Sequence, residues 1–193
     1  MGKTYEAIDG RLREFIEAQP VFFVATAPLA EDGHVNLSPK GHNGSLQVLD
    51  ERTLAYLDFG GSGAETHAHL RENGRITLMW CAFSGPPNIV RVHGIGEPVY
   101  RDDPRFQELI PRFAEADGPG VRAIIIVRAK RIGDTCGFAV PFMEYREERP
   151  LLRQFFGRKS DDEFAEYCES KEYNVNSIDG LPALPLPLPP RKS

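Results

Sequence analysis

The chain has 193 residues, which is enough for one domain with a terminal extension and a sizeable buried core. Hydrophobic residues make up 41% of it and charged residues 26%, which is the range of globular proteins and excludes a disordered chain. The formal net charge of −5 argues against nucleic acid as a main partner, because binding a phosphate backbone needs a concentrated basic face.

Apolar runs and cysteines point to the compartment. No apolar run approaches the roughly 20 residues of a membrane-spanning helix, and the start MGKTYEAIDGRLREF lacks the apolar core of a secretory signal. Cys81, Cys136 and Cys168 are widely spaced without a CxxC pair, so reduced thiols are expected. We therefore expect a cytoplasmic protein with no membrane partner.

The first part of the chain reads as one helix followed by short strands. Helical spacing of apolar residues predicts an amphipathic helix over residues 4–18, which ends before Pro20. β-Branched and aromatic residues predict a strand over residues 21–27, and the segments HVNLS, SLQVLD and LAYLDF follow it. Short strands repeating about every ten residues are typical of an antiparallel sheet or barrel.

A glycine-rich segment interrupts these strands. Residues 60–74, GGSGAETHAHLRENG, begin with glycines, are predicted to become a short helix near Ala64, and end at Asn73-Gly74. Strands resume over residues 75–83 and 88–100. In a run of such strands, sequence neighbours are expected to pair.

One more helix and one more strand precede the last sixty residues, which change character. A helix with a proline near its middle is predicted over residues 103–117, and the strongest strand of the chain over residues 121–133. Two further helices are separated near Gly157, and the final GLPALPLPLPPRKS favours polyproline II. We divide the chain into a domain of residues 1–135 and an extension of residues 136–193 that packs on the barrel or on a dimer partner.

These elements predict a mainly β fold with helices, in which an antiparallel sheet closes into a barrel. Closure removes the unpaired edges of the sheet, which favours a barrel over a sandwich. The flanking helices and the C-terminal helical and proline-rich extension are then attached to the barrel.

Motifs for several familiar chemistries are missing. The sequence has no GxSxG elbow for a hydrolase, no P-loop lysine and no complete dinucleotide fingerprint. His67 and His69 stand two residues apart on a predicted helix, so their imidazoles face different directions and no metal site is expected.

Two segments are suited to bind an anion. VNLSPKG ends a strand in a hydroxyl, a rigid proline, a cation and a glycine, supplied by Ser38, Lys40 and Gly41 among others. FGGSGAET follows a strand and opens a helix, where backbone N–H groups converge, and it adds the hydroxyls of Ser62 and Thr66. Side by side, they would form a phosphate cradle for a cofactor that brings its own reactivity. The alternative is a plain turn and a glycine-rich helix start.

The order of these elements resembles the pyridoxamine 5′-phosphate oxidase-like family of FMN-binding split β-barrels. The likeness covers roughly residues 10–135 and is carried by VNLSPKG, RTLAYLDFGGSGAETHAHLRENGRITLMW and IVRVHGIGEPV. The segments CGFAVPFMEY and SIDGLPAL are similar to the C-terminal signature of an uncharacterised branch of that family.

The resemblance implies an antiparallel split β-barrel and a homodimer with FMN bound between its subunits. It also implies an FMN-dependent oxidoreductase that transfers hydride or electrons between small molecules, NAD(P)H being a possible donor. The residues that match the family's cofactor-binding positions are Ser38, Lys40, Gly41, Gly61, Ser62, Glu65, Thr66 and Arg91. Arg91 lies on the family's arginine-bearing strand, where it faces the cofactor, the dimer partner or solvent.

One departure from the family keeps alternatives open. Many members carry Arg or Lys in the second segment, where this chain has Ser62-Gly63-Ala64-Glu65-Thr66. A protein that binds a flavin, a deazaflavin or haem for storage or sensing, without turnover, is therefore an alternative, as is an empty pocket. Oxidation of pyridoxamine phosphate itself is not indicated, because Arg146, Arg149 and Arg153 are candidates for its second cationic pocket by charge alone.

Overall fold

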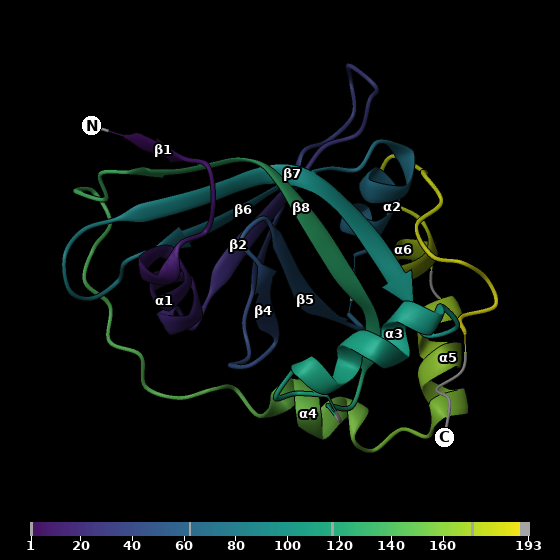
Figure 1. The fold of residues 1–193 in the computed structure, drawn as a ribbon. Coiled ribbons are helices and arrows are strands. Elements are labelled where there is room, and N and C mark those ends of the chain that lie inside the picture. The colour runs from purple at the N-terminus through teal and green to yellow at the C-terminus, as the bar shows by residue number, and fades with distance from the viewer. Residues whose placement is uncertain (1, 62, 117, 171, 190–193) are drawn as a thin grey trace.

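The computed structural model describes residues 2–61, 63–116, 118–170 and 172–189. Its elements in chain order are shown in Figure 1. They are β1 (Lys3–Tyr5), α1 (Gly10–Ala18), β2 (Phe22–Thr26), β3 (Asn36–Lys40), β4 (Leu46–Asp50), β5 (Thr53–Phe59), α2 (Glu65–Glu72), β6 (Arg75–Cys81), β7 (Ile89–Tyr100), α3 (Pro104–Leu109), the 3₁₀-helix η1 (Ile110–Arg112), β8 (Val121–Thr135), α4 (Leu151–Phe156), α5 (Asp161–Glu169) and α6 (Glu172–Val175).

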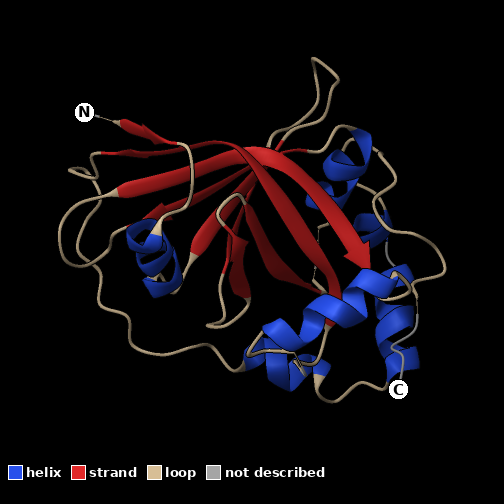
Figure 2. Ribbon diagram, in the orientation of Figure 1, coloured by secondary structure: helices blue, strands red, loops and turns tan. Residues whose placement is uncertain are grey.

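The strands form one eight-stranded antiparallel sheet, in the order β3-β2-β6-β7-β8-β5-β4, with β1 paired to β8. Figure 2 shows α1 on one side of the curved sheet and most other helices gathered on the opposite side. Strands β3 and β4 lie at the two ends of the order. The predicted class, a mainly β split barrel with flanking helices, is confirmed.

The interior of the curved sheet holds the main core. Alternation along β2 turns Phe22 and Val24 inward, where Phe22 contacts Tyr56 edge to face and stacks on Trp80. Helix α1 closes one end of this core with buried Leu12 and Ile16.

Strand β8 is apolar on both faces because both are covered. Ile125 and Val127 face the barrel core, while Ile124 and Ile126 face a second cluster that includes Phe106 of α3. This double burial explains the continuous apolar run that made β8 the strongest strand in the sequence.

Three sequence-based predictions about elements are wrong. The first helix begins at Gly10, capped by Asp9, because the preceding Lys3–Tyr5 pairs with β8. The helix expected over residues 103–117 gives way to a 3₁₀ turn containing Pro111, which lacks the N–H that a continuing helix needs. Neighbouring strands do not always pair, since β3 bonds only to β2 while β4 bonds to β5.

The C-terminal extension packs on its own chain. Helices α4 and α5 flank Gly157 as predicted, and a short α6 follows. Leu184 and Leu188 of the proline-rich segment join a buried cluster with Phe156 and Phe164. Among the described helices, none is both long and apolar enough to cross a membrane. The division of the chain at residue 135, where β8 ends, stays a prediction.

Candidate functional site

The two anion-suited segments border the same cavity. Its volume is about 290 Å³, and Ser38 and Lys40 of β3 line it together with Glu65 and Thr66 of α2. A second cavity of about 220 Å³ adjoins it through Lys40 and reaches Gly41 and Gly61. Seven of the eight predicted cofactor-binding residues lie in described parts of the chain, and six of these line one cavity or the other. Ser62 lies outside the described residues.

The two segments are also joined by hydrogen bonds. Ser38 donates its hydroxyl to Asn36 Oδ1 at 2.9 Å, and Asn36 Nδ2 donates to Thr66 Oγ1 at 3.1 Å. The same amide donates to Thr26 Oγ1 at 3.2 Å. Asn36 therefore holds the end of β3 against the first turn of α2, a role that the sequence analysis did not assign.

A buried carboxylate lies at the back of the cavity. Lys40 Nζ lies 3.2 Å from Asp58 Oδ1, while the Nε of Arg122 and the Nε2 of His67 each lie 2.9 Å from Asp58 Oδ2. Asp58 and His67 are fully buried, and the Arg122 side chain is 3% exposed. The four groups come from β3, β5, α2 and β8, so the Lys40–Asp58 pair links β3, at one end of the strand order, to β5, the strand next to the other end.

An irregularity in the sheet directs Arg122 to this cluster. Asp58 pairs with Ala123 and Phe59 pairs with Val121, which leaves Arg122 as the extra residue of a β-bulge on β8. Bulges bend a strand and re-aim a side chain. The bulge thus places one guanidinium of a largely apolar strand beside the carboxylate of Asp58.

The electrostatics of the cluster are set by burial and by the cations. Burial opposes ionisation of Asp58, but Arg122, Lys40 and His67 outweigh it and hold its pKa well below the ordinary 3.8. Burial lowers the pKa of His67, and the attraction of Asp58 does not compensate. With a neutral imidazole, the two cations and the one carboxylate give this cluster a net positive charge, and the carboxylate of Glu65 lies at the wall of the same cavity.

One donor of Arg122 has no hydrogen-bond acceptor among the described residues. Its Nη1 is buried and unpaired, and Arg122 lines both cavities. A buried charged donor without an acceptor is costly, so an anion placed between Arg122 and Lys40 would stabilise the site. Arg122 is therefore a second cation in the cavity wall, one that the sequence analysis did not identify. A lone arginine in the apolar run VRAIIIV was the signal, because a buried charge requires a partner.

Arg91 and the two helical histidines lie elsewhere. Arg91 borders neither of these two cavities and donates its Nη1 to Thr135 Oγ1 at 2.9 Å, so its predicted role toward a cofactor or dimer partner stays a prediction. His69 lies 2.9 Å from Thr26 Oγ1 while His67 contacts Asp58, so the two imidazoles face different directions. Within the described ranges, no group of three or more His, Cys, Asp or Glu side chains could hold a metal ion.

The fold and the site define a split β-barrel protein with Lys40 and Arg122 in the wall of one cavity. A family model described as pyridoxamine 5′-phosphate oxidase matches residues 8–136. A pyridoxamine 5′-phosphate oxidase family protein of Aspergillus flavus, ustO, is 37% identical over 195 residues, which cover 93% of this chain and 77% of that protein. The chain belongs to the pyridoxamine 5′-phosphate oxidase family.

Solved structures show the same fold at low identity. A variant of HupZ from Group A Streptococcus is 21% identical with a TM-score of 0.54, covering 66% of this chain and 99% of that one. A candidate pyridoxamine 5′-phosphate oxidase from Lactobacillus delbrueckii is 16% identical with a TM-score of 0.50, covering 67% and 98%. At this identity the likeness supports the fold alone.

Proposed function

We propose that the protein is an FMN-dependent oxidoreductase that holds the flavin phosphate between Lys40 and Arg122. The observation that carries this proposal is the buried Nη1 of Arg122, which has no acceptor among the described residues. Arg122 and Lys40 line the same cavity as the predicted phosphate-binding segments. Membership of the pyridoxamine 5′-phosphate oxidase family supports it.

The residues present fit a phosphate. Lys40 and Arg122 would make charge-assisted hydrogen bonds to its oxygens, and the Thr66 hydroxyl and the backbone N–H groups at the start of α2 would add neutral ones. Asp58 holds the two cations in place. A flavin held there would supply the chemistry of hydride and electron transfer between NAD(P)H or another small donor and an acceptor, and the protein would orient it and exclude water.

We also propose a homodimer in the cytoplasm. Leu37 lines the cavity and is 64% exposed, and the neighbouring Val35 is 73% exposed. A second copy laid on β3 would cover these side chains and one wall of the cavity. This agrees with a flavin bound between subunits, as the family resemblance implies.

A second candidate is a protein that binds a flavin, a deazaflavin or haem for storage or sensing. Glu65 places a carboxylate at the wall of the cavity, and the titratable groups beside Lys40 are committed to one another in the Asp58 cluster. Because the acid and the bases of that cluster are paired with one another, the cluster suits binding without turnover.

The proposal is tested by titrating the purified protein with FMN and with riboflavin, followed by flavin fluorescence. Lys40→Met is expected to weaken the binding of FMN about 10- to 100-fold, which corresponds to the loss of one charged hydrogen bond. The affinity for riboflavin, which has no phosphate, is expected to stay unchanged. Lys130→Met, at an exposed position on β8, is the matched control. Equal FMN affinity in Lys40→Met and the parent protein would refute the phosphate site.

Turnover separates the two candidates. The FMN-loaded protein is mixed with NADH or NADPH, and the flavin absorbance is followed first without and then with oxygen. Bleaching by either donor and recovery with oxygen support an oxidoreductase. A tightly bound flavin that no donor reduces favours storage or sensing.

A further inference from the structure

We infer that binding of an anion between Lys40 and Arg122 is coupled to protonation of His67, which Asp58 and Tyr100 position from opposite sides. The inference rests on the anion site of the proposed function and adds that His67 takes up a proton when the anion binds. It makes His67 a positioning residue whose charge state follows the occupancy of the site.

The geometry is a hydrogen-bonded chain from the cavity to the C-terminal segment. His67 Nε2 lies 2.9 Å from Asp58 Oδ2, and His67 Nδ1 lies 2.9 Å from the Tyr100 hydroxyl. The same hydroxyl oxygen lies 3.3 Å from the backbone carbonyl oxygen of Ala183. Strand β5, helix α2, strand β7 and the proline-rich segment each supply one member, and the imidazole between them is fully buried.

Counting hydrogens shows that this hydrogen-bonded chain of groups is one proton short of forming all its hydrogen bonds when His67 is neutral. A neutral imidazole that donates Nε2–H to Asp58 must accept at Nδ1, and it then takes the single hydroxyl hydrogen of Tyr100. The Ala183 carbonyl is left without that donor. A protonated imidazole donates from both nitrogens and frees the Tyr100 hydroxyl for Ala183, so all three hydrogen bonds form.

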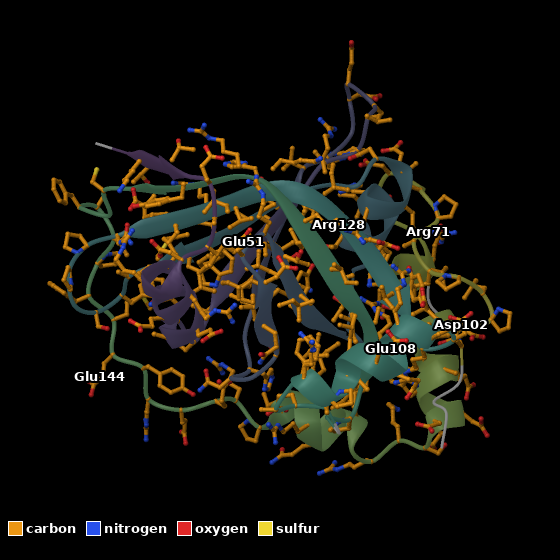
Figure 3. The ribbon with its side chains drawn as sticks, viewed as in Figure 1. Glu51, Arg71, Asp102, Glu108, Arg128 and Glu144 are labelled. Carbon is orange, nitrogen blue, oxygen red and sulfur yellow. The ribbon has the colours of Figure 1, made fainter. Side chains whose placement is uncertain are left out.

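The charges around His67 explain why the free protein lacks this proton. Burial lowers the pKa of His67, and Arg122 on β8 and Lys40 on β3 lower it further, while Asp58 on β5 raises it. Tyr100 stays protonated, since burial raises its pKa to about 12 against the opposing charges of Arg71 and Arg122. Arg71 is labelled on α2 in Figure 3.

An anion reverses this balance. Its negative charge, placed between Lys40 and Arg122, offsets the two cations that repel a proton from His67 and leaves the attraction of Asp58. The pKa of His67 therefore rises on binding, and a proton enters with the anion. Affinity for the anion then falls as pH rises between the free pKa, which lies below 6.5, and the higher pKa of the complex. Outside this window His67 contributes no pH dependence.

The test is calorimetric titration of the protein with FMN in buffers of different ionisation enthalpy, which counts the protons taken up. His67→Gln keeps an N–H donor for Asp58 but cannot take a proton. We expect the parent protein to take up more protons than His67→Gln, by up to about one per FMN. Ionisation of the flavin phosphate is common to both and cancels in the difference. His93→Gln, at an exposed position on β7, is expected to match the parent protein.

A second measurement separates this inference from the proposed function and does not depend on a variant's folding. Ring ¹H–¹⁵N spectra of the parent protein are recorded with inorganic phosphate, and the His67 signals are expected to move to those of the doubly protonated ring. If FMN fails to bind but phosphate protonates His67, the flavin function is wrong and the coupling stands. If FMN binds with equal proton uptake in the parent protein and His67→Gln, or if neither anion shifts His67, the coupling is wrong.

Discussion

Asp58 and Arg122 form an ion pair in which both side chains are almost completely buried, with Nη2 at 2.7 Å from Oδ2 and exposed fractions of 1% and 3%. Removing one partner of such a pair leaves the other charge buried without compensation. Asp58→Asn is therefore expected to lower the free energy of unfolding by about 3–5 kcal/mol, measured by denaturant titration.

Asp103→Asn is the matched control for that substitution. Asp103 caps α3 and pairs with Arg105 at the surface, so the same chemical change is expected to cost at most about 1 kcal/mol. Equal free energies of unfolding in the two variants would show that the buried ion pair contributes no more to stability than the surface pair.

Acid should destabilise the protein through the same carboxylate. The pKa of Asp58 is held well below 3.8 in the folded state, so its stabilising contribution is fully present above the unfolded value and is lost as pH falls below it. We expect the melting temperature to fall steeply below about pH 4. Asp58→Asn should show a shallower fall in melting temperature, since the carboxylates that remain, such as Asp103 and Asp179, have pKa values that are lowered less than that of Asp58. Parallel curves would contradict this assignment.

The sequence predicted the residues of β3 and α2 that line the cavity and missed Arg122 of β8. Ser38, Lys40, Glu65 and Thr66 were identified because each lies in a short local motif that ends a strand or opens a helix. Arg122 was missed because its position depends on a bulge in the pairing of β8 with β5, and a bulge has no local signature there.

The same limit explains the errors in the fold. Strand types and most boundaries follow from local alternation, but pairing order depends on contacts far apart in the chain. Lys3–Tyr5 became a strand only because Ile132–Asp134 offers it a partner. The apolar spacing of residues 4–18 carries no information about pairing with a segment so far away in the sequence, so it predicted a helix from residue 4 onward.

The C-terminal segment is held to the barrel by an exposed pair. Asp179 accepts from the backbone N–H of His34 at 2.8 Å and lies 2.6 Å from His34 Nδ1. The hydrogen bond to Asp179 raises the pKa of His34, so the pair contributes fully below 6.5 and is lost as pH rises through the folded value.

Hydrogen exchange at residues 176–184 is expected to follow this pair. In the parent protein, protection of this segment beyond the intrinsic effect of pH should decrease as pH rises through the pKa of His34. His34→Gln should show low protection at every pH, while His93→Gln should behave like the parent protein. Protection independent of pH in the parent protein would show that apolar packing alone holds the segment.

Gly120 directly precedes β8 and packs against Phe156 of α4, which leaves no room for a side chain. Its φ is +84°, and a Cβ built on it would lie 2.5 Å from Phe156 Cδ2. An alanine there incurs about 1–2 kcal/mol for the left-handed backbone alone, and it also displaces a buried aromatic ring. Gly120→Ala is therefore expected to lower the free energy of unfolding by more than about 2 kcal/mol.

Gly10→Ala is the control for this last substitution, with an effect of opposite sign. Gly10 opens α1, has an ordinary backbone conformation, and a methyl group added to it would meet no atom within 4 Å. Alanine there removes conformational freedom from the unfolded chain and is expected to stabilise the protein by about 0.4–1 kcal/mol. Because the two changes are chemically identical, opposite shifts in the denaturation midpoint assign the cost at Gly120 to its conformation and to Phe156. A loss of stability at both positions would instead show that the conformations of these two glycines do not decide their tolerance.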